Sequence, residues 1–135
     1  MSLTETLLEL SKRHTAALPV RDRADFEDEL DRLRMLRIPE DGLGLGDYLP
    51  DFALEDGAGR LWTSGELLDR GPLVLALFRG DWCPYCDLTM AALEEARPAI
   101  EALGATAVGV MPDRREHVVR AAARRNIGYL LLSDP

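Results

Sequence analysis

The sequence predicts an α/β protein in which a parallel sheet is covered by helices and preceded by a helical arm. Three apolar runs alternate with two segments of helical periodicity, and these runs are residues 73–78, 105–111 and 129–134. The order strand, helix, strand, helix, strand is typical of a right-handed parallel sheet. A glycine-rich stretch, EDGLGLGDYLP at residues 40–50, separates this region from the segments before it. We therefore expect a helical N-terminal arm at residues 1–41 and an α/β domain at residues 42–135.

Composition argues against several classes of function. The net charge of the 135 residues is −8, whereas binding of nucleic acid or of anionic membranes starts from an excess of Lys and Arg. No run of about 18 apolar residues exists, so we expect no membrane-spanning segment. The first residues, MSLTETLLELSKRH, have no basic stretch leading into an apolar core, as a secretory signal has. The cytoplasm is the expected compartment.

Two helices are expected in the arm. The first ends near residue 18, before Pro19, and its leucines recur at helical spacing: Leu3, Leu7, Leu8 and Leu10. Asp22 is a candidate N-cap for a second helix that runs to about Arg37 and ends at Ile38-Pro39. Because apolar stripes on isolated helices need a surface to cover them, we expect the arm to be an association or docking element.

The sequence of the first part of the domain predicts short strands and a short helix. Residues 51–62, DFALEDGAGRLW, fit two short strands around a glycine-rich turn. The segment TSGELLDRG at residues 63–71 fits a short helix that is capped by Thr63 or Ser64. The run LVLALF at residues 73–78 is apolar at every position, which is typical of a strand covered on both faces.

Two longer helices are expected in the second part of the domain. The first follows strand 73–78 and extends to about Leu103, kinked or broken near Pro98 and ended by Gly104. The second lies in RREHVVRAAARRN, residues 114–126, and the side chains expected to face inward are Val118, Val119, Ala122 and Ala123.

The chain's only two cysteines lie where the first of these helices begins. Cys83 and Cys86 form a Cys-Pro-Tyr-Cys motif at a strand-to-helix junction, where reactive groups collect in parallel sheets. Asp81 or its neighbour can act as N-cap, and Pro84 suits the first turn. The positive end of the helix dipole favours a thiolate there, and thiols in such motifs have pKa values of roughly 3.5–7.5. Cys86 lies one turn further on, where helical packing covers more of its sulfur, so Cys83 is the expected nucleophile and Cys86 the resolver.

Other interpretations of these cysteines are weaker. Two inert buried thiols are unexpected behind the polar, turn-like lead-in Gly80-Asp81-Trp82. A zinc site needs four ligands, and the remaining candidates are His14 and His117, one at each end of the chain.

The residues around the motif carry alternative interpretations. Trp82 is expected to form a lid over the sulfur, or else to be ordinary core. Tyr85 is expected to be exposed between the cysteines, as a contact for a thiol substrate or as a solvated tip. The arginines of segment 114–126 predict a solvated helix face, with a partner or anionic-ligand site as the alternative, and they are Arg114, Arg115, Arg120, Arg124 and Arg125. His117 is expected on the surface of the same helix.

Several separated motifs resemble a known family. GLGLGDYLPDFALEDGAGRLW, LVLALFRGDWCPYC, LGATAVGVMPD and YLLLSD together resemble the peroxiredoxin-like branch of the alkyl hydroperoxide reductase / thiol-specific antioxidant (AhpC/TSA) family over residues 42–135. The resemblance implies a thioredoxin-like fold, with Cys83 at the peroxidatic position. Cys86 matches the second cysteine of thioredoxin-type motifs, and the tetrapeptide is also that of glutaredoxins. The implied activity is that of a thiol-dependent peroxidase or antioxidant oxidoreductase without metal or organic cofactor.

The resemblance leaves alternatives for the reaction. The substrate is a hydroperoxide or a disulfide, and the implied reductant is a thiol such as a thioredoxin or glutathione system. Gly80 stands where peroxiredoxins place a Thr or Ser, and Arg79 is either a local positive charge that replaces the family's arginine or a solvated strand-end residue. A thiol–disulfide oxidoreductase and a non-catalytic binding or dimerisation module are the alternative functions.

The same resemblance predicts an open sheet edge. Family members continue with two antiparallel strands and a final helix, so the chain is expected to hold a C-terminally truncated, incomplete version of the sheet. Strand 73–78 then lies at an uncovered edge, next to strand 105–110 and with strand 129–132 beyond it. Natural proteins cover or charge such edges. A homodimer is the expected solution, and the folded-back arm or a segment outside the given chain are the alternatives.

Overall fold

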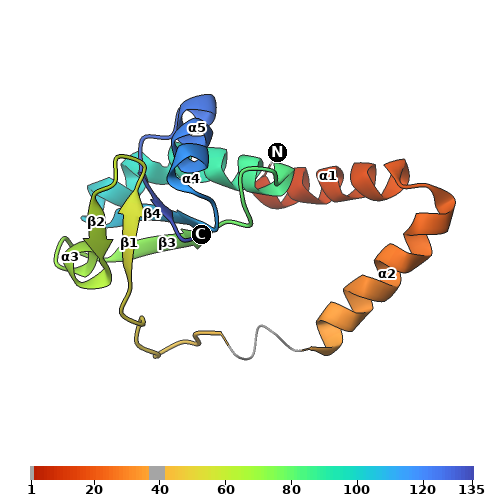
Figure 1. Cartoon of the computed structure of the whole chain (residues 1–135), viewed down its shortest axis with the longest axis horizontal. Helices are drawn as coiled ribbons and strands as arrows, with labels where there is room; N and C mark the ends of the chain where they lie inside the picture. The colour runs from red at the N-terminus through yellow and green to blue at the C-terminus, as the bar shows by residue number, and fades with distance from the viewer. Residues whose placement is uncertain (1, 37–41) are drawn as a thin grey trace. The chain divides into compact units, whose positions relative to one another are not determined.

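The structure is a computed structural model that describes residues 2–36 and 42–135. The chain divides into two compact units, Met1–Leu49 and Pro50–Pro135. Figure 1 shows the elements of both units along the chain. No helix among the described residues is long and apolar enough to cross a membrane.

The first unit holds two helices, α1 (Leu3–Ala17) and α2 (Val20–Met35). Ser2 caps α1 through a reciprocal pair of hydrogen bonds with Glu5, which satisfies backbone donors at the helix start. The prediction that Asp22 caps α2 is wrong, because Pro19 takes the N-cap position and Asp22 lies in the first turn. The predicted stop at residues 38–39 lies outside the described residues. Neither helix contains a buried residue.

The second unit is built on a five-stranded sheet with the order β2-β1-β5-β4-β3. The strands are β1 (Ala53–Asp56), β2 (Leu61–Thr63), β3 (Leu73–Leu77), β4 (Thr106–Met111) and β5 (Leu130–Ser133). The pairs β3–β4 and β4–β5 are parallel, as predicted. The predicted hairpin of β1 and β2 is confirmed, but β1 also pairs antiparallel with β5. The sheet is therefore mixed rather than purely parallel.

Three helices belong to the same unit: α3 (Ser64–Leu68), α4 (Pro84–Ala102) and α5 (Arg115–Arg125). Thr63 caps α3 as predicted, through hydrogen bonds with Glu66. Helix α4 continues through Pro98 without a break. It ends where Gly104, at φ 74°, directs its N–H to the carbonyl of Glu101, a termination that glycine allows at little cost.

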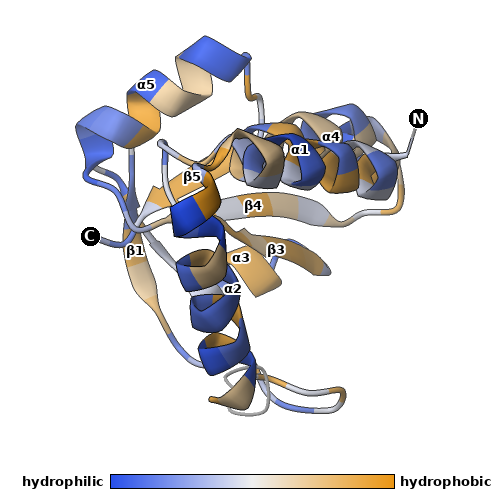
Figure 2. Ribbon diagram, turned by 90° about the vertical axis from the view of Figure 1, so that its right-hand side faces the viewer, coloured by the Kyte–Doolittle hydropathy of each residue, from blue (hydrophilic) through white to orange (hydrophobic). Residues whose placement is uncertain are grey.

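The central strand β4 has core on both of its faces. Ala107 and Met111 point into a cluster with residues of α4 and α5, whereas Val108 and Val110 point into a second cluster with Leu67 of α3. The hydropathy colouring in Figure 2 shows β3 and β5 as largely apolar and α5 as largely polar with an apolar patch. In α5, Val118 is buried as predicted, but Val119 is half exposed, and Ala121 is the second buried residue.

Strand β3 has core on both faces, as predicted, but the cover is incomplete: Leu73 and Leu75 pack against one cluster and Ala76 against the other. It pairs only with β4, at the edge of the described sheet, as the resemblance predicts. Leu77 is 77% exposed and Val74 is 39% exposed. The apolar run therefore reflects cover on both faces of the strand and does not reveal that the strand lies at the edge of the described sheet.

Candidate active site

Cys83 lies where the chain leaves β3 and begins α4. It is the N-cap residue of α4, with extended backbone angles, and Pro84 follows in the first turn as predicted. No side chain caps the helix, so the prediction of an Asp81 N-cap is wrong. Phe78 and the loop after it lead into this start, and the Cys83 N–H closes the loop on the carbonyl of Gly80 at 3.2 Å.

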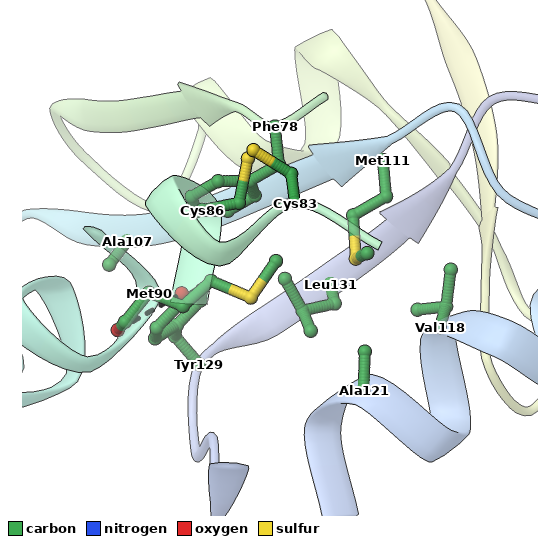
Figure 3. Packing of buried hydrophobic residues seen from close by; sticks show 10 residues of the cluster. All are labelled: Phe78, Cys83, Cys86, Met90, Ala107, Met111, Val118, Ala121, Tyr129 and Leu131. Atoms are coloured by element: carbon green, nitrogen blue, oxygen red, sulfur yellow. Dashed lines mark hydrogen bonds between the residues drawn. The ribbon is translucent and has the colours of Figure 1, made fainter. Parts of the chain in front are cut away.

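Both thiols are free and both are buried. Cys83 has no exposed surface and Cys86 is 6% exposed. Figure 3 shows the two sulfur atoms side by side, above the core that Met90, Met111 and Leu131 form. The prediction that Cys86 is the more covered sulfur is therefore wrong, because Cys83 turns into the core instead of facing solvent.

The surroundings of Cys86 disfavour its thiolate form. Burial raises the pKa of the Cys86 thiol, and the neighbouring Cys83 raises it further through a hydrogen bond and through its charge. The Arg79 backbone N–H, which donates to Cys86 Sγ at 3.2 Å, acts in the opposite direction without reversing the shift.

Position 80 requires glycine, both because of its backbone angle and because of the side chains around it. Its φ is 137°, in the region that favours glycine. A Cβ at this position would lie 2.7 Å from Nε1 of Trp82 and 3.3 Å from Oδ2 of Asp113. This geometry leaves no room for the Thr or Ser that peroxiredoxins carry there.

Trp82 and Arg79 form an exposed pair next to the motif. Trp82 is 67% exposed, so the alternative that it is ordinary core is wrong. The guanidinium of Arg79 lies over its ring at 4.9 Å from the centroid, a cation–π contact. The Arg79 side chain is therefore exposed but contacts the indole, while its backbone N–H donates to Cys86 Sγ.

Tyr85, between the cysteines, is half buried and packs against the core cluster of the two thiols. The prediction of an exposed Tyr85 is therefore wrong, since the first turn of α4 directs this side chain toward the core. His117 is exposed on α5 as predicted. Among residues 2–36 and 42–135, no group of three or more His, Cys, Asp or Glu side chains is placed to hold a metal ion.

Arginines of α5 bind the loop that precedes Cys83. Arg124 and Arg125 both form ion pairs with Asp81, and Arg125 also pairs with Asp87. Partial burial would raise the pKa of Asp81, but the hydrogen bond from Arg125 and the charges of both arginines lower it overall. The prediction of a solvated arginine face is therefore wrong for Arg125, whose side chain is only 8% exposed, whereas Arg124 is exposed. Sequence reasoning missed the network because its partners lie 38 and 44 residues apart.

Fold and site together define the class of this protein. A central parallel β-α-β arrangement with a Cys-x-x-Cys pair at the start of a core-packed helix is a thioredoxin-like domain, which confirms the predicted fold. A family model described as "AhpC/TSA family" matches residues 45–135. The chain belongs to the AhpC/TSA family.

Solved structures agree with this assignment. Peroxidoxin BcpB from Mycobacterium tuberculosis superposes with a TM-score of 0.66 at 28% identity, over 69% of this chain and 60% of that one. A putative protein disulfide isomerase from Bacteroides thetaiotaomicron gives 0.59 at 26% identity, over 69% of this chain and 59% of its own. Peroxiredoxin Q from Xanthomonas campestris, at 23% identity and a TM-score of 0.57, shows the same fold over 62% of this chain and 52% of its own.

The chain is shorter than these structural relatives, since it spans between 52% and 60% of their lengths. None of the curated proteins compared with the chain matches it.

Proposed function

We propose that the chain is a thiol-dependent oxidoreductase, and that Cys83 and Cys86 are its redox pair. The observation that carries the proposal is the placement of two free thiols side by side at the start of α4, inside a core cluster. A thiolate at a helix N-terminus is stabilised by the helix dipole. The raised pKa of Cys86 supports its assignment as the resolving thiol rather than the nucleophile.

With a hydroperoxide, the proposed cycle has three steps. The Cys83 thiolate attacks the terminal peroxide oxygen, the O–O bond breaks, and the alkoxide leaves with a proton as alcohol or water. Cys86 then attacks the resulting sulfenic acid, so that water leaves and the Cys83–Cys86 disulfide forms. An external dithiol, of the thioredoxin or glutathione type, supplies two electrons and two protons and restores both thiols. We assign this chemistry to the cytoplasm, where such reductants keep thiols reduced.

A disulfide substrate is the second candidate, and Gly80 favours it. The hydroxyl that orients a peroxide in peroxiredoxins has no place beside Gly80, since its φ is 137° and a Cβ would clash with Trp82. The relative from Bacteroides thetaiotaomicron, titled a putative protein disulfide isomerase, is consistent with exchange chemistry on this scaffold. In that reaction the Cys83 thiolate attacks a substrate sulfur, and Cys86 releases the reduced substrate from the mixed disulfide.

Single-turnover kinetics with hydrogen peroxide and with oxidised glutathione test the proposal. We expect Cys83→Ser to abolish the reaction with either oxidant, and Cys86→Ser to accumulate sulfenic acid or a mixed disulfide on Cys83. The faster oxidant identifies the substrate class. If both oxidants react with the protein no faster than with free cysteine, the chain is instead a binding module, and the proposed activity is refuted.

A further inference from the structure

One arginine joins the two carboxylates that bracket the redox motif. Asp81 precedes Cys83 by two positions, and Asp87 directly follows Cys86. Arg125, from the last turn of α5, pairs with both of them. Only 8% of its side chain is exposed.

Arg125 uses all of its five N–H donors. Nε and Nη2 donate to Oδ1 of Asp87, the first at 2.6 Å. Nη1 donates to Oδ1 of Asp81 at 3.0 Å and to the carbonyl of Ala121 at 3.3 Å, and Nη2 reaches the Asp81 carbonyl at 3.2 Å. A planar guanidinium can bridge four acceptor atoms in this way, whereas an ammonium cannot hold the same geometry.

Asp81 is held from a third side as well. Its backbone N–H donates to Oδ2 of Asp113, in the loop after β4, at 2.9 Å. Its side chain also accepts a hydrogen bond from Arg124 at 2.7 Å. The segment from Asp81 to Asp87, which contains both cysteines, is therefore fastened at each end to α5.

We propose that Arg125 is a positioning residue for Cys83: it fixes the two ends of the motif and balances the charges of Asp81 and Asp87, which flank the two cysteines in the chain. This inference rests on the proposed thiol chemistry, because it concerns the readiness of the same thiol to react.

The direction of the effect follows from the charges around the motif. Titratable or charged groups face this region from four segments: the loop after β3, α4, the loop after β4 and α5. These groups are Arg79, Asp81, Tyr85, Cys86, Asp87, Asp113, Arg120, Arg124 and Arg125. Loss of the Arg125 charge removes the counter-charge that the flanking residues Asp81 and Asp87 share, and leaves Asp81 with Arg124. Neighbouring negative charge disfavours a thiolate, whereas removal of a carboxylate favours it. Replacing Arg125 and replacing Asp81 should therefore shift the pH dependence of Cys83 alkylation in opposite directions.

The test is the pH profile of alkylation of Cys83 by iodoacetamide, in a background with Cys86→Ser so that one thiol is modified. We expect Arg125→Ala to move the midpoint of this profile up by about half a pH unit or more, which slows alkylation at neutral pH at least about threefold. Arg125→Lys, which keeps the charge, should restore most of the midpoint. Asp81→Asn should move it down.

The matched control is Arg97→Ala. Arg97 forms ion pairs with Glu94 and Glu101 on α4, about 20 Å along the helix from the motif, so its loss should lower stability and leave the profile unchanged. A merely structural Arg125 would behave like this control, and that result would overturn the proposal. An unchanged profile in Asp81→Asn would overturn it even if Arg125→Ala does not fold.

This experiment is separate from the proposed function. Iodoacetamide reports on the thiolate itself, so shifted profiles in a protein that turns over neither peroxide nor disulfide would count against the proposed function alone. Unshifted profiles in an active enzyme would count against the role of Arg125 alone.

Discussion

Gly80 shows how one backbone angle limits the chemistry of this site. The residue is buried, its φ is 137°, and the Trp82 indole and the Asp113 carboxylate occupy the space where a side chain would go. The loop therefore brings Cys83 directly from β3 to the helix start without the hydroxyl that the family resemblance leads one to expect. In the proposed chemistry, the groups left to assist the thiol are the helix start and the charged residues of α5.

Replacing Gly80 by Thr should destabilise the protein by about 2 kcal/mol or more. The substitution combines an unfavourable φ with a clash against Trp82. Chemical denaturation measures this effect. Gly104→Ala is the matched control, because Gly104 has a φ of 74° but open space around it, and backbone strain alone should cost it about 1 kcal/mol. Equal losses in the two variants would contradict the packing argument.

Asp81 should make the stability of the protein sensitive to acid. Its folded pKa is lowered, so the Asp81 bonds contribute fully above the ordinary value of about 3.9 and are lost as the pH falls through the lower folded value. Between pH 6 and pH 3, urea unfolding should show a loss of free energy that is about 1 kcal/mol smaller in Asp81→Asn than in the unsubstituted protein. The same loss in both proteins would show that Asp81 is not a source of the acid sensitivity.

At the scale of elements, local patterns predicted most of the second unit. The ends of α4 follow from Pro84 and Gly104, and the parallel order of β3, β4 and β5 follows from their alternation with helices. These features depend on residues close together in the chain, which is why periodicity and capping rules find them.

The features that sequence reasoning missed depend on distant contacts. The antiparallel pairing of β1 with β5 joins segments more than 70 positions apart, and no local signal places a hairpin at one end of the sheet or the other. The burial of Cys83 depends on residues from α4, β4, α5 and β5 that gather around it in the folded core. An arginine that pairs with a loop 44 residues away looks like any surface arginine in the sequence.

At the scale of the whole molecule, the described sheet has an open edge at β3, and natural proteins normally cover such an edge. Backbone groups of β3 face a neighbour on one side only within the described sheet, and Leu77 is largely exposed. We propose that a second copy of the chain covers this edge, because antiparallel pairing of two β3 strands about a two-fold axis is self-complementary.

Sedimentation at micromolar concentration should show a dimer, and Leu77→Lys should weaken it at least about tenfold, since a charged residue opposes edge-to-edge pairing. Leu103→Lys is the control, because Leu103 is 83% exposed but lies outside the strands. A monomer in which the amides of residues 73–77 exchange slowly would contradict the dimer and point to the arm as the cover. Deletion of residues 1–41 would then make the same amides exchange fast, while the thiol chemistry of Cys83 is retained.

The central claim is that Cys83 and Cys86 form one redox pair, and the mass of the intact protein after stoichiometric oxidation tests it most directly. One equivalent of hydrogen peroxide or of a reactive disulfide should remove two hydrogens per chain, and peptide mapping should locate the new bond between Cys83 and Cys86. A dithiol should reverse the change. Oxidation that stops at one cysteine, or that joins cysteines of different chains while leaving the pair within each chain open, would contradict the account.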